Sequence, residues 1–266
     1  MKTRVLIPKC VFINMCSLGI DNLGNNCYIN AILQVFRYLT PIAKKLFTVY
    51  DSDKLVDSLL GMLYNSNSDN RTDDLNRLLA ELQAVGVDPY SQGDAHEFYL
   101  TVADRLTKYI QPGQTISTLA CTCGHVLKNI EPFLSISING DVLDGICKYQ
   151  EPEQVDATCE QCGRRGLIKQ LSVVPSKMCA IHLKRFTNRN KLYYEVSLPK
   201  TITVGNKNFR LEAVCNHHGN MFGGHYTCCA LTRQGWYMFN DERVEKIDGL
   251  PEKSDLPYIL FYSYIE

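Results

Sequence analysis

Three separated stretches of this sequence hold residue types that could together support nucleophilic catalysis. The first, GIDNLGNNCYINAILQ at residues 19–34, places Cys27 between a turn rich in Gly and Asn and an apolar segment with helical spacing. A thiol at a helix N-terminus lies near unpaired backbone N–H groups and the positive end of the helix dipole, which lowers its pKa. Free cysteine is also among the most often buried residues, so this stretch alone leaves a core residue, a metal ligand and a nucleophile open.

A cysteine nucleophile needs a base, and His225 is the strongest candidate among the six histidines. Gly223 and Gly224 precede it and would let a substrate pass close to the backbone, while HYTCCAL is a predicted strand that would fix the imidazole ring. The other histidines have simpler explanations, such as a place on a predicted helix, in a strand-like segment or in a Gly-rich loop.

An acceptor must hold the imidazole in the correct tautomer, and GWYMFNDERV offers two. Asn240 and Asp241 follow a predicted hairpin that would return them beside His225, although Asn-Asp is also a common turn sequence. Asn22 could donate its side-chain amide to a developing oxyanion together with the Cys27 backbone N–H, or it could be another turn residue. The order Cys, His, Asn/Asp is that of a papain-like constellation.

Two close pairs of cysteines form a second candidate site of a different kind. Cys121 and Cys123 lie in CTCGH, and Cys159 and Cys162 lie in CEQCGRRG. Four thiolates bind Zn²⁺ tetrahedrally, and the Gly after each pair would let the chain turn around the metal, although the C-x-C spacing is tighter than usual. This zinc would be structural, since four thiolates leave no position open for catalysis. A disulfide, four unrelated core cysteines and a zinc site that has lost its affinity are the alternatives.

The elements that must position these residues divide the chain into a helical part and a strand-rich part. Apolar residues spaced three or four apart predict helices over 27–39, 55–63, 75–85 and 91–110. Asn25 or Asn26 would open the first helix, and Thr40-Pro41 would end it. Short β-branched or aromatic segments predict strands over 131–138, 171–174, 178–186, 191–198, 209–217, 225–232, 236–240 and 258–265. With no internal repeat or linker, these parts are expected to pack as one α+β unit.

Composition limits the possible partners. The 266 residues are 45% hydrophobic and carry 28 Lys+Arg against 28 Asp+Glu, so no global basic field points to nucleic acid or to a membrane surface. No apolar run is long enough for a membrane-spanning helix. Pro8 and Lys9 interrupt the apolar start of the chain, which indicates a short N-terminal extension rather than a signal peptide. The twelve cysteines therefore predict an intracellular, reducing compartment.

Taken together, GIDNLGNNCYINAILQ, QGDAHEF, both cysteine pairs, IHLKRF and GGHYTCCALTRQGWYMFNDERV resemble the ubiquitin-specific protease family of deubiquitinating enzymes. The resemblance runs from about Gly19 to the C-terminus. It implies a papain-like α+β fold with a helical thumb, fingers that hold the paired cysteines and a palm of antiparallel strands. The corresponding boundaries are about 1–18 for the extension, 19–112 for the thumb, 113–172 for the fingers and 173–266 for the palm.

The resemblance also implies roles for the catalytic candidates. It places the nucleophile at Cys27, the base at His225, the third triad member at Asn240 and the oxyanion donor at Asn22. Asp241 matches the adjacent acidic position, which in some members assists or replaces the third residue.

Substrate contacts follow from the same resemblance. Asp94 and Glu97 match carboxylates that pair with arginines near the C-terminal tail of ubiquitin. Gly223, Gly224 and Tyr226 would line a narrow channel for the Gly-Gly end of that tail. The loop NHHGNMFGG, residues 216–224, resembles the mobile blocking loop of the family, with Gly219 and Gly223-Gly224 as hinges.

The implied activity is hydrolysis after the C-terminal glycine of ubiquitin by a monomer whose partners are ubiquitin and ubiquitinated proteins. The chain departs from the family pattern at Asn26, where Thr is usual, and at Gly93, where Gln is common. A protease for a ubiquitin-like modifier, a weakly active ubiquitin-binding module and a zinc-binding interaction protein are the alternatives.

Overall fold

The computed structural model describes residues 18–46, 52–64, 71–187, 190–220 and 222–265, so nearly all of the predicted extension over 1–18 lies outside the described residues. The first half contains α1 (Cys27–Tyr38), α2 (Thr40–Leu46), α3 (Lys54–Tyr64), α4 (Arg71–Ala84) and α5 (Ala95–Arg105). Next come β1 (Gly113–Ala120), β2 (Val126–Phe133), β3 (Ile136–Ile138), α6 (Val142–Gln150), β4 (Glu153–Thr158), β5 (Arg165–Val174), β6 (Met178–Leu183) and β7 (Val196–Ser197). The last are β8 (Thr201–Val204), β9 (Lys207–Gly219), β10 (Gly224–Thr232), β11 (Gly235–Asn240), β12 (Arg243–Ile247), β13 (Lys253–Ser254) and β14 (Pro257–Tyr264).

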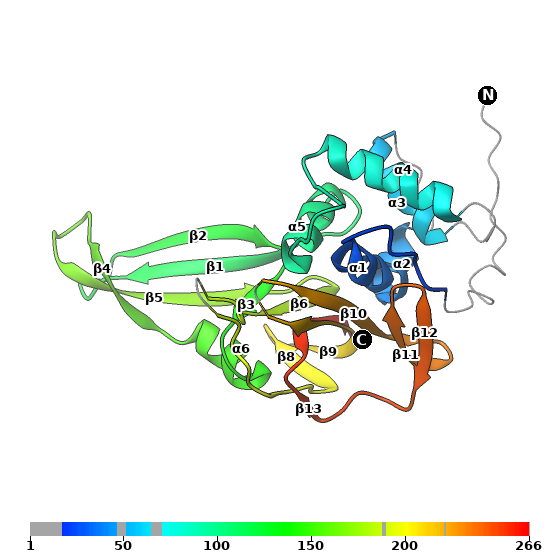
Figure 1. Ribbon diagram of the computed structural model, residues 1–266. Helices are drawn as coiled ribbons and strands as arrows, with labels where there is room; N and C mark the ends of the chain where they lie inside the picture. Colours follow the sequence, from blue (N-terminus) through cyan, green and yellow to red (C-terminus); the bar gives the residue numbers. More distant parts are fainter. Residues whose placement is uncertain (1–17, 47–51, 65–70, 188–189, 221, 266) are drawn as a thin grey trace.

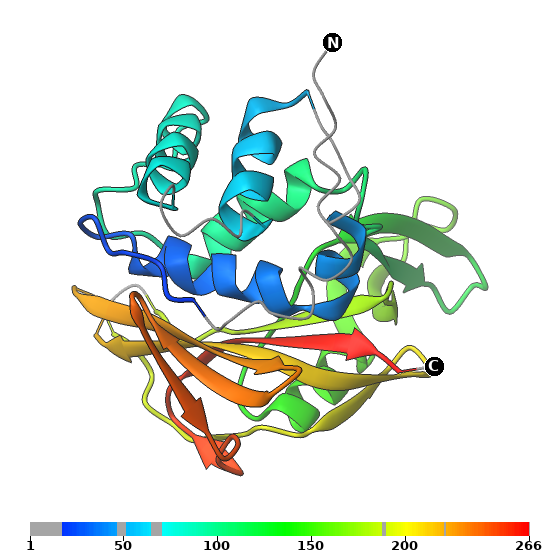
Figure 2. The same cartoon turned by 90° about the vertical axis from the view of Figure 1, so that its right-hand side faces the viewer.

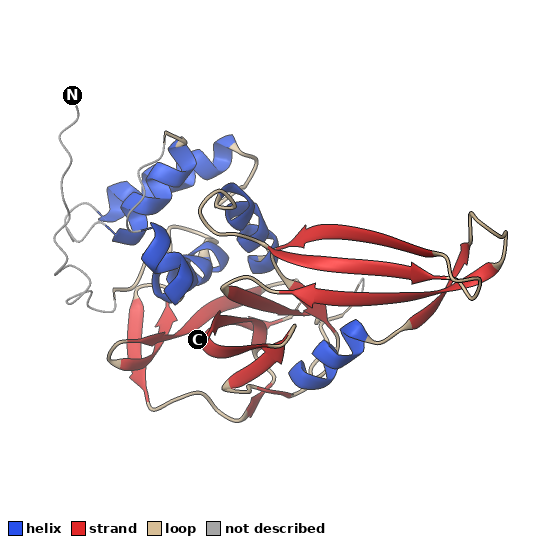
Figure 3. Ribbon diagram, turned by 180° about the vertical axis from the view of Figure 1, so that it is seen from behind, coloured by secondary structure: helices blue, strands red, loops and turns tan. Residues whose placement is uncertain are grey.

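A large sheet with the order β12-β11-β10-β9-β14-β6-β3 forms the base of the molecule, with α1 to α5 above it (Figure 2). Its strand pairs are antiparallel except β3 with β6. A second sheet, β2-β1-β5-β4, projects away from this body as a long extension (Figures 1 and 3). The predicted papain-like α+β fold, with a helical part and antiparallel sheets, is confirmed.

The centre of the large sheet is buried on both faces, which explains why β14 is apolar at nearly every position. Phe261 and Ile259 on one face join the core beneath the helices, whereas Leu260 and Tyr262 on the other face join a core covered by α6 and β8. Alternate residues of a strand point to opposite faces, so a strand between two layers reads as a continuous apolar run.

Helix α1 lies between the sheet and the remaining helices, and its residues 27–37 are all buried (Figure 2). A helix that is buried on every side belongs to the centre of a core. Its first residue, Cys27, is thereby held against β10, which carries His225. None of the described helices is both long and apolar enough to cross a membrane.

The four predicted helices are confirmed, but α2 and α6 were missed. Thr40-Pro41 ends α1 as predicted, yet Pro is also favoured in the first turn of a helix, and the chain starts α2 there at once. Gly145 weakens the helical pattern of α6. It is needed because a Cβ there would lie 2.7 Å from a side-chain carbon of Ile138.

The predicted strand over 191–198 is mostly wrong, because only Val196 and Ser197 form a strand. Fully buried Arg185 explains the difference, since its guanidinium donates to the backbone oxygens of Leu192 (3.4 Å) and Tyr194 (2.9 Å). Carbonyls that are satisfied by a side chain do not need a neighbouring strand.

Candidate active site

Cys27 is the first residue of α1, and only 6% of its surface is exposed. Burial raises the pKa of its thiol, and the Tyr226 backbone N–H opposes this rise only in part. The prediction that the helix N-terminus lowers this pKa is therefore wrong on balance, because desolvation outweighs the amide groups. Asn26 is the N-cap of α1, as predicted, although its side chain does not cap the helix. A neutral resting thiol needs a base to become a nucleophile.

His225 directly precedes Tyr226 on β10, so the imidazole and the thiol belong to the same small region. Its Nε2 lies 2.6 Å from Asn240 Oδ1 at the end of β11, and 3.8 Å from Asp241 Oδ2. The antiparallel pairing of β10 and β11 produces this contact, as the predicted hairpin requires. Because Asn240 engages Nε2, the second ring nitrogen, Nδ1, is left for proton exchange with a nucleophile.

Asp241 is 9% exposed and has a positive φ of 52°. Its Oδ2 accepts a 2.8 Å hydrogen bond from Asn22 Nδ2, and its backbone oxygen accepts from Ile20 N–H at 2.9 Å. Asp241 thus binds the predicted oxyanion donor more closely than it approaches the predicted base. The Gly19 position is part of this contact, because a Cβ there would lie 2.3 Å from the Glu242 backbone oxygen.

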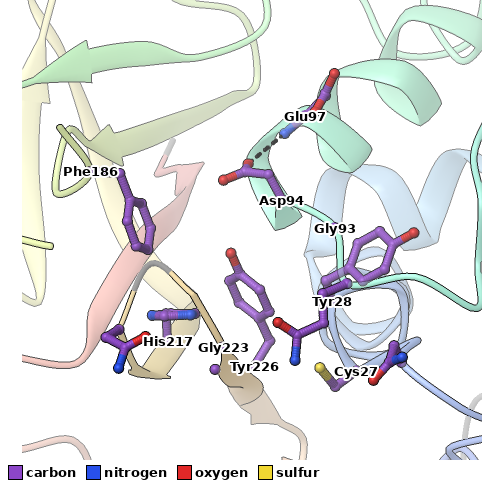
Figure 4. Close-up of a pocket in the computed structure, with 13 residues that line it drawn as sticks. Cys27, Tyr28, Gly93, Asp94, Glu97, Phe186, His217, Gly223 and Tyr226 are labelled. Atoms are coloured by element: carbon purple, nitrogen blue, oxygen red, sulfur yellow. Dashed lines mark hydrogen bonds between the residues drawn. The ribbon is translucent and has the colours of Figure 1, made fainter. Parts of the chain in front are cut away.

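A pocket of about 380 Å³ opens beside the thiol. Cys27 and Tyr226 line one part of it, whereas Asp94 and Glu97 line another part at the N-terminal end of α5 (Figure 4). Gly93 also lines the pocket, and a Cβ at this position would lie 2.6 Å from the Tyr28 ring. A larger residue at position 93 would therefore require Tyr28 to shift.

The two predicted carboxylates, Asp94 and Glu97, differ in how many hydrogen bonds they make within the protein. Asp94 caps α5, with its Oδ1 accepting from the backbone N–H of His96 (2.7 Å) and Glu97 (2.9 Å). Its Oδ2 accepts from the Tyr258 hydroxyl at 2.5 Å, a partner that the sequence did not reveal. Glu97 has an exposed side chain in the first turn of α5. Of the two, Glu97 is freer to bind a ligand.

The predicted Gly223-Gly224 pair has two different reasons for being glycine. A Cβ on Gly224 would lie 2.2 Å from His217 Nε2, so no side chain fits there, whereas Gly223 has only Gln92 within 4 Å. The end of β9, which leads into this loop, is held by buried Lys191, whose Nζ donates to the His217 backbone oxygen at 2.6 Å. Met221, in the middle of the predicted blocking loop, lies outside the described residues.

All four predicted metal ligands meet at the tip of the β2-β1-β5-β4 sheet, where their sulfur atoms lie within 4.8 Å of one another. Cys121 and Cys162 are 3.7 Å apart, and Cys123 and Cys159 are 3.8 Å apart. Tetrahedral zinc with bonds of about 2.3 Å requires sulfur separations of about 3.8 Å, so these four thiols fit the ion.

Each cysteine pair is followed by a glycine in the left-handed region, as predicted. Gly124 has φ 91° and Gly163 has φ 69°. Their N–H groups donate to the backbone oxygens of Cys121 and Cys159, both at 2.9 Å. The first bond closes a turn over three residues and the second over four, and the tighter C-x-C spacing does not prevent the four sulfurs from converging.

Comparison with known proteins decides which family this arrangement belongs to. The family model described as ubiquitin carboxyl-terminal hydrolase matches residues 18–262. The chain belongs to this family. A probable ubiquitin carboxyl-terminal hydrolase 8 from Schizosaccharomyces pombe is 26% identical over 294 residues, covering 92% of this chain and 64% of that protein. Ubiquitin carboxyl-terminal hydrolase 20 from Arabidopsis thaliana is 23% identical and covers 92% of this chain, which spans 43% of its length.

Solved structures of the family share the fold. The SAGA DUB module containing Ubp8, bound to monoubiquitin, matches with a TM-score of 0.80 and 22% identity, covering 94% of this chain and 69% of the matched chain. The same module bound to ubiquitin aldehyde has a TM-score of 0.80 and 22% identity, with 94% and 70% of the two chains covered. The predicted family resemblance is confirmed.

Proposed function

We propose that this chain is a deubiquitinating cysteine protease, which hydrolyses the peptide or isopeptide bond after the C-terminal glycine of ubiquitin. The observation that carries this proposal is that His225, Asn240 and Asn22 meet around Asp241, whose charge also acts on the Cys27 thiol, in a chain of this family. Each of these groups has a place in a thiol-dependent acyl transfer.

In the proposed reaction, His225 takes the proton of the Cys27 thiol as the sulfur attacks the glycine carbonyl. A base is required because burial raises the pKa of this thiol. Asn240 accepts from the imidazole and stabilises the imidazolium that forms. His225 then gives the proton to the leaving amine, and water hydrolyses the resulting thioester with the same base.

Asn22 would stabilise the negative charge that develops on the carbonyl oxygen. An amide nitrogen has two hydrogens, and one of those on Asn22 is bound to Asp241. The other can therefore bind the oxyanion together with the Cys27 backbone N–H. In this role Asp241 positions the oxyanion donor, and Asn240 orients the base.

For recognition, Glu97 and Asp94 would bind the basic residues near the end of the ubiquitin tail. Both carboxylates line the pocket beside Cys27. Gly223, Gly224 and Tyr226 line the same pocket, where they would lie beside the Gly-Gly end of the tail. Local carboxylates can attract a basic tail although the whole chain is neutral.

We assign a structural Zn²⁺ to the cysteine cluster. The apolar cluster beside it is small, with Cys121, Cys159 and Leu167 as its buried members. A bound zinc would hold the β1–β2 and β4–β5 turns together where few apolar contacts do so. Such an ion has no part in the hydrolysis, because the four thiols complete its coordination.

The proposed compartment and oligomeric state rest on the cysteines and on the catalytic groups. We propose a reducing intracellular compartment, because the proposed catalytic thiol and the cysteine cluster both need reduced cysteines. All the proposed catalytic groups come from one chain, so a monomer is sufficient for activity. The parts over 19–112, 113–172 and 173–266 would act as thumb, fingers and palm around ubiquitin and ubiquitinated proteins.

The proposal is tested with a ubiquitin that carries an electrophile at its C-terminal glycine. Wild-type protein should form a covalent adduct, and Cys27→Ala should not, because the adduct needs the thiol. Probes built on ubiquitin-like modifiers are the matched controls. Stronger labelling by one of them would assign the chain to that modifier instead, and no adduct together with reversible ubiquitin binding would indicate a binding module.

A further inference from the structure

Asn30, on the second turn of α1, connects the two halves of the catalytic region. Its Nδ2 donates to Asp241 Oδ1 at 2.8 Å, while Asn22 occupies the other oxygen of the same carboxylate at 2.8 Å. Asn30 and Asp241 are 2% and 9% exposed, so this contact is almost completely shielded from water. Hydrogen bonds to a charged group are strong in such surroundings.

Asn30 also holds the segment that carries Asn22. Its Nδ2 lies 3.3 Å from the backbone oxygen of Ile20 and 3.2 Å from that of Asp21. One side chain on a rigid, buried helix therefore contacts both the carboxylate that binds Asn22 and the backbone immediately before Asn22. Two such restraints limit where the Asn22 amide can lie.

A carboxamide could rotate and present its oxygen to Asp241, which would repel the carboxylate. Asn26 prevents this rotation, because its Nδ2 donates to Asn30 Oδ1 at 3.1 Å. Asn26 is itself fixed, since it is fully buried and its Oδ1 accepts from Leu23 N–H at 2.9 Å. The orientation of Asn30 is thus determined by its neighbours on both sides.

We propose that Asn30 is a positioning residue for the oxyanion donor Asn22, acting through Asp241, and that Asn26 sets the orientation of Asn30. The hydrogen bonds of these two side chains lead to Asp241 and to the backbone before Asn22, so their influence reaches the reaction through the oxyanion donor. This inference rests on the proposed function, in which Asn22 stabilises the developing charge.

The test measures two reactions of the same thiol. Hydrolysis of ubiquitin carrying a fluorogenic C-terminal amide needs the oxyanion donor, whereas alkylation of Cys27 by iodoacetamide does not, because no oxyanion forms. For Asn30→Ala we expect kcat to fall at least about tenfold, with KM and the alkylation rate within about twofold of wild type. A purely structural defect would lower both reactions together.

Asn208→Ala is the matched control, because exposed Asn208 accepts a hydrogen bond from Thr203 (2.8 Å) far from this network along β9. It should leave both reactions unchanged. Asn26→Ser keeps an oxygen for Leu23 N–H but has no amide for Asn30. Its kcat for hydrolysis should fall by less than that of Asn30→Ala, and its alkylation rate should stay close to that of wild type. This variant decides the question if Asn30→Ala does not fold.

An unchanged kcat in both variants would overturn the proposal, and so would equal losses in hydrolysis and alkylation. Failure of the proposed function has a different signature, since wild-type protein itself would then not hydrolyse the ubiquitin substrate.

Discussion

The two neighbouring acceptors, Asn240 and Asp241, provide the sharpest test of the site. Asn240 Oδ1 lies 2.6 Å from His225 Nε2, whereas Asp241 Oδ2 lies 3.8 Å from it and 2.8 Å from Asn22 Nδ2. Asn240→Ala should therefore impair the base, and Asp241→Ala should impair the oxyanion donor. Both variants lose activity, but by different routes.

The size of each loss follows from the bonds removed. A hydrogen bond to a charged partner contributes about 1.5–3 kcal/mol, so loss of the Asn240 contact to the imidazolium should lower kcat about 10- to 150-fold. Asp241→Ala removes the acceptor that holds Asn22, and loss of one oxyanion donor costs about 100- to 1,000-fold in kcat. Asn240→Asp keeps an acceptor oxygen at the same place and should retain most of the activity.

Alkylation of Cys27 by iodoacetamide separates the two routes. It depends on proton removal by His225, so Asn240→Ala should slow it in parallel with hydrolysis. It does not depend on an oxyanion, so Asp241→Ala should not slow it. Indeed, the Asp241 charge helps to raise the pKa of the Cys27 thiol, and its removal favours the thiolate.

The assignment of Asn240 as the orienter would be refuted if Asn240→Ala hydrolysed the ubiquitin substrate at the wild-type rate while Asp241→Ala lost both reactions. Equal behaviour of Asn240→Ala and Asn240→Asp would also contradict it, because only the second can accept the imidazole hydrogen bond. Circular dichroism and thermal unfolding of each variant provide the control for folding.

Three further predictions concern other parts of the chain. Burial raises the pKa of Cys179 to about 12, so its proton stays bound in the folded state while the unfolded thiol loses it near pH 8.5. Stability in urea should therefore fall above about pH 8.5, by up to about 1.4 kcal/mol per pH unit for this thiol, and less steeply in Cys179→Ala. Glu97→Gln should raise KM for the ubiquitin substrate by up to roughly fivefold with kcat unchanged, whereas Asp94→Ala should in addition lose about 1 kcal/mol of stability with the helix cap. Metal analysis should find about one zinc per wild-type chain and much less in Cys159→Ser, while Cys147→Ser, an exposed thiol outside the cluster, keeps the metal. A metal-free, stably folded wild-type protein would contradict the zinc assignment.

The sequence correctly predicted the structural features that depend on neighbouring residues or on the order of adjacent strands. The apolar spacing over 27–39 requires a helix, and the polar turn before it makes Cys27 the first helical residue. The hairpin between the strands of His225 and Asn240 follows from chain order and strand length, and it brings these two side chains into contact. A glycine after each cysteine pair likewise permits the left-handed turn that was found.

Sequence reasoning failed where the outcome depends on groups that are distant along the chain. The pKa of the Cys27 thiol was expected to fall because the neighbouring residues place this thiol at a helix N-terminus. It rises instead, because the surrounding core excludes water. The sequence also did not reveal that Tyr258, 164 positions away, donates a hydrogen bond to one oxygen of Asp94. Neither the depth of burial nor a remote hydroxyl can be read from neighbouring residues.

The sequence by itself determined the α+β architecture and the cysteine cluster, and it predicted Cys27 and His225 as candidate nucleophile and base, because each depends on residue type, spacing or periodicity. Only the tertiary structure decided which hydrogen-bond partners the side chains of Asn240 and Asp241 have. Asp241 stands next to Asn240 in the chain, but its left-handed backbone turns the carboxylate towards Asn22 and Asn30 on the helix side. Hydrogen bonds between distant segments select these partners, and they exist only after the helix has packed on the sheet.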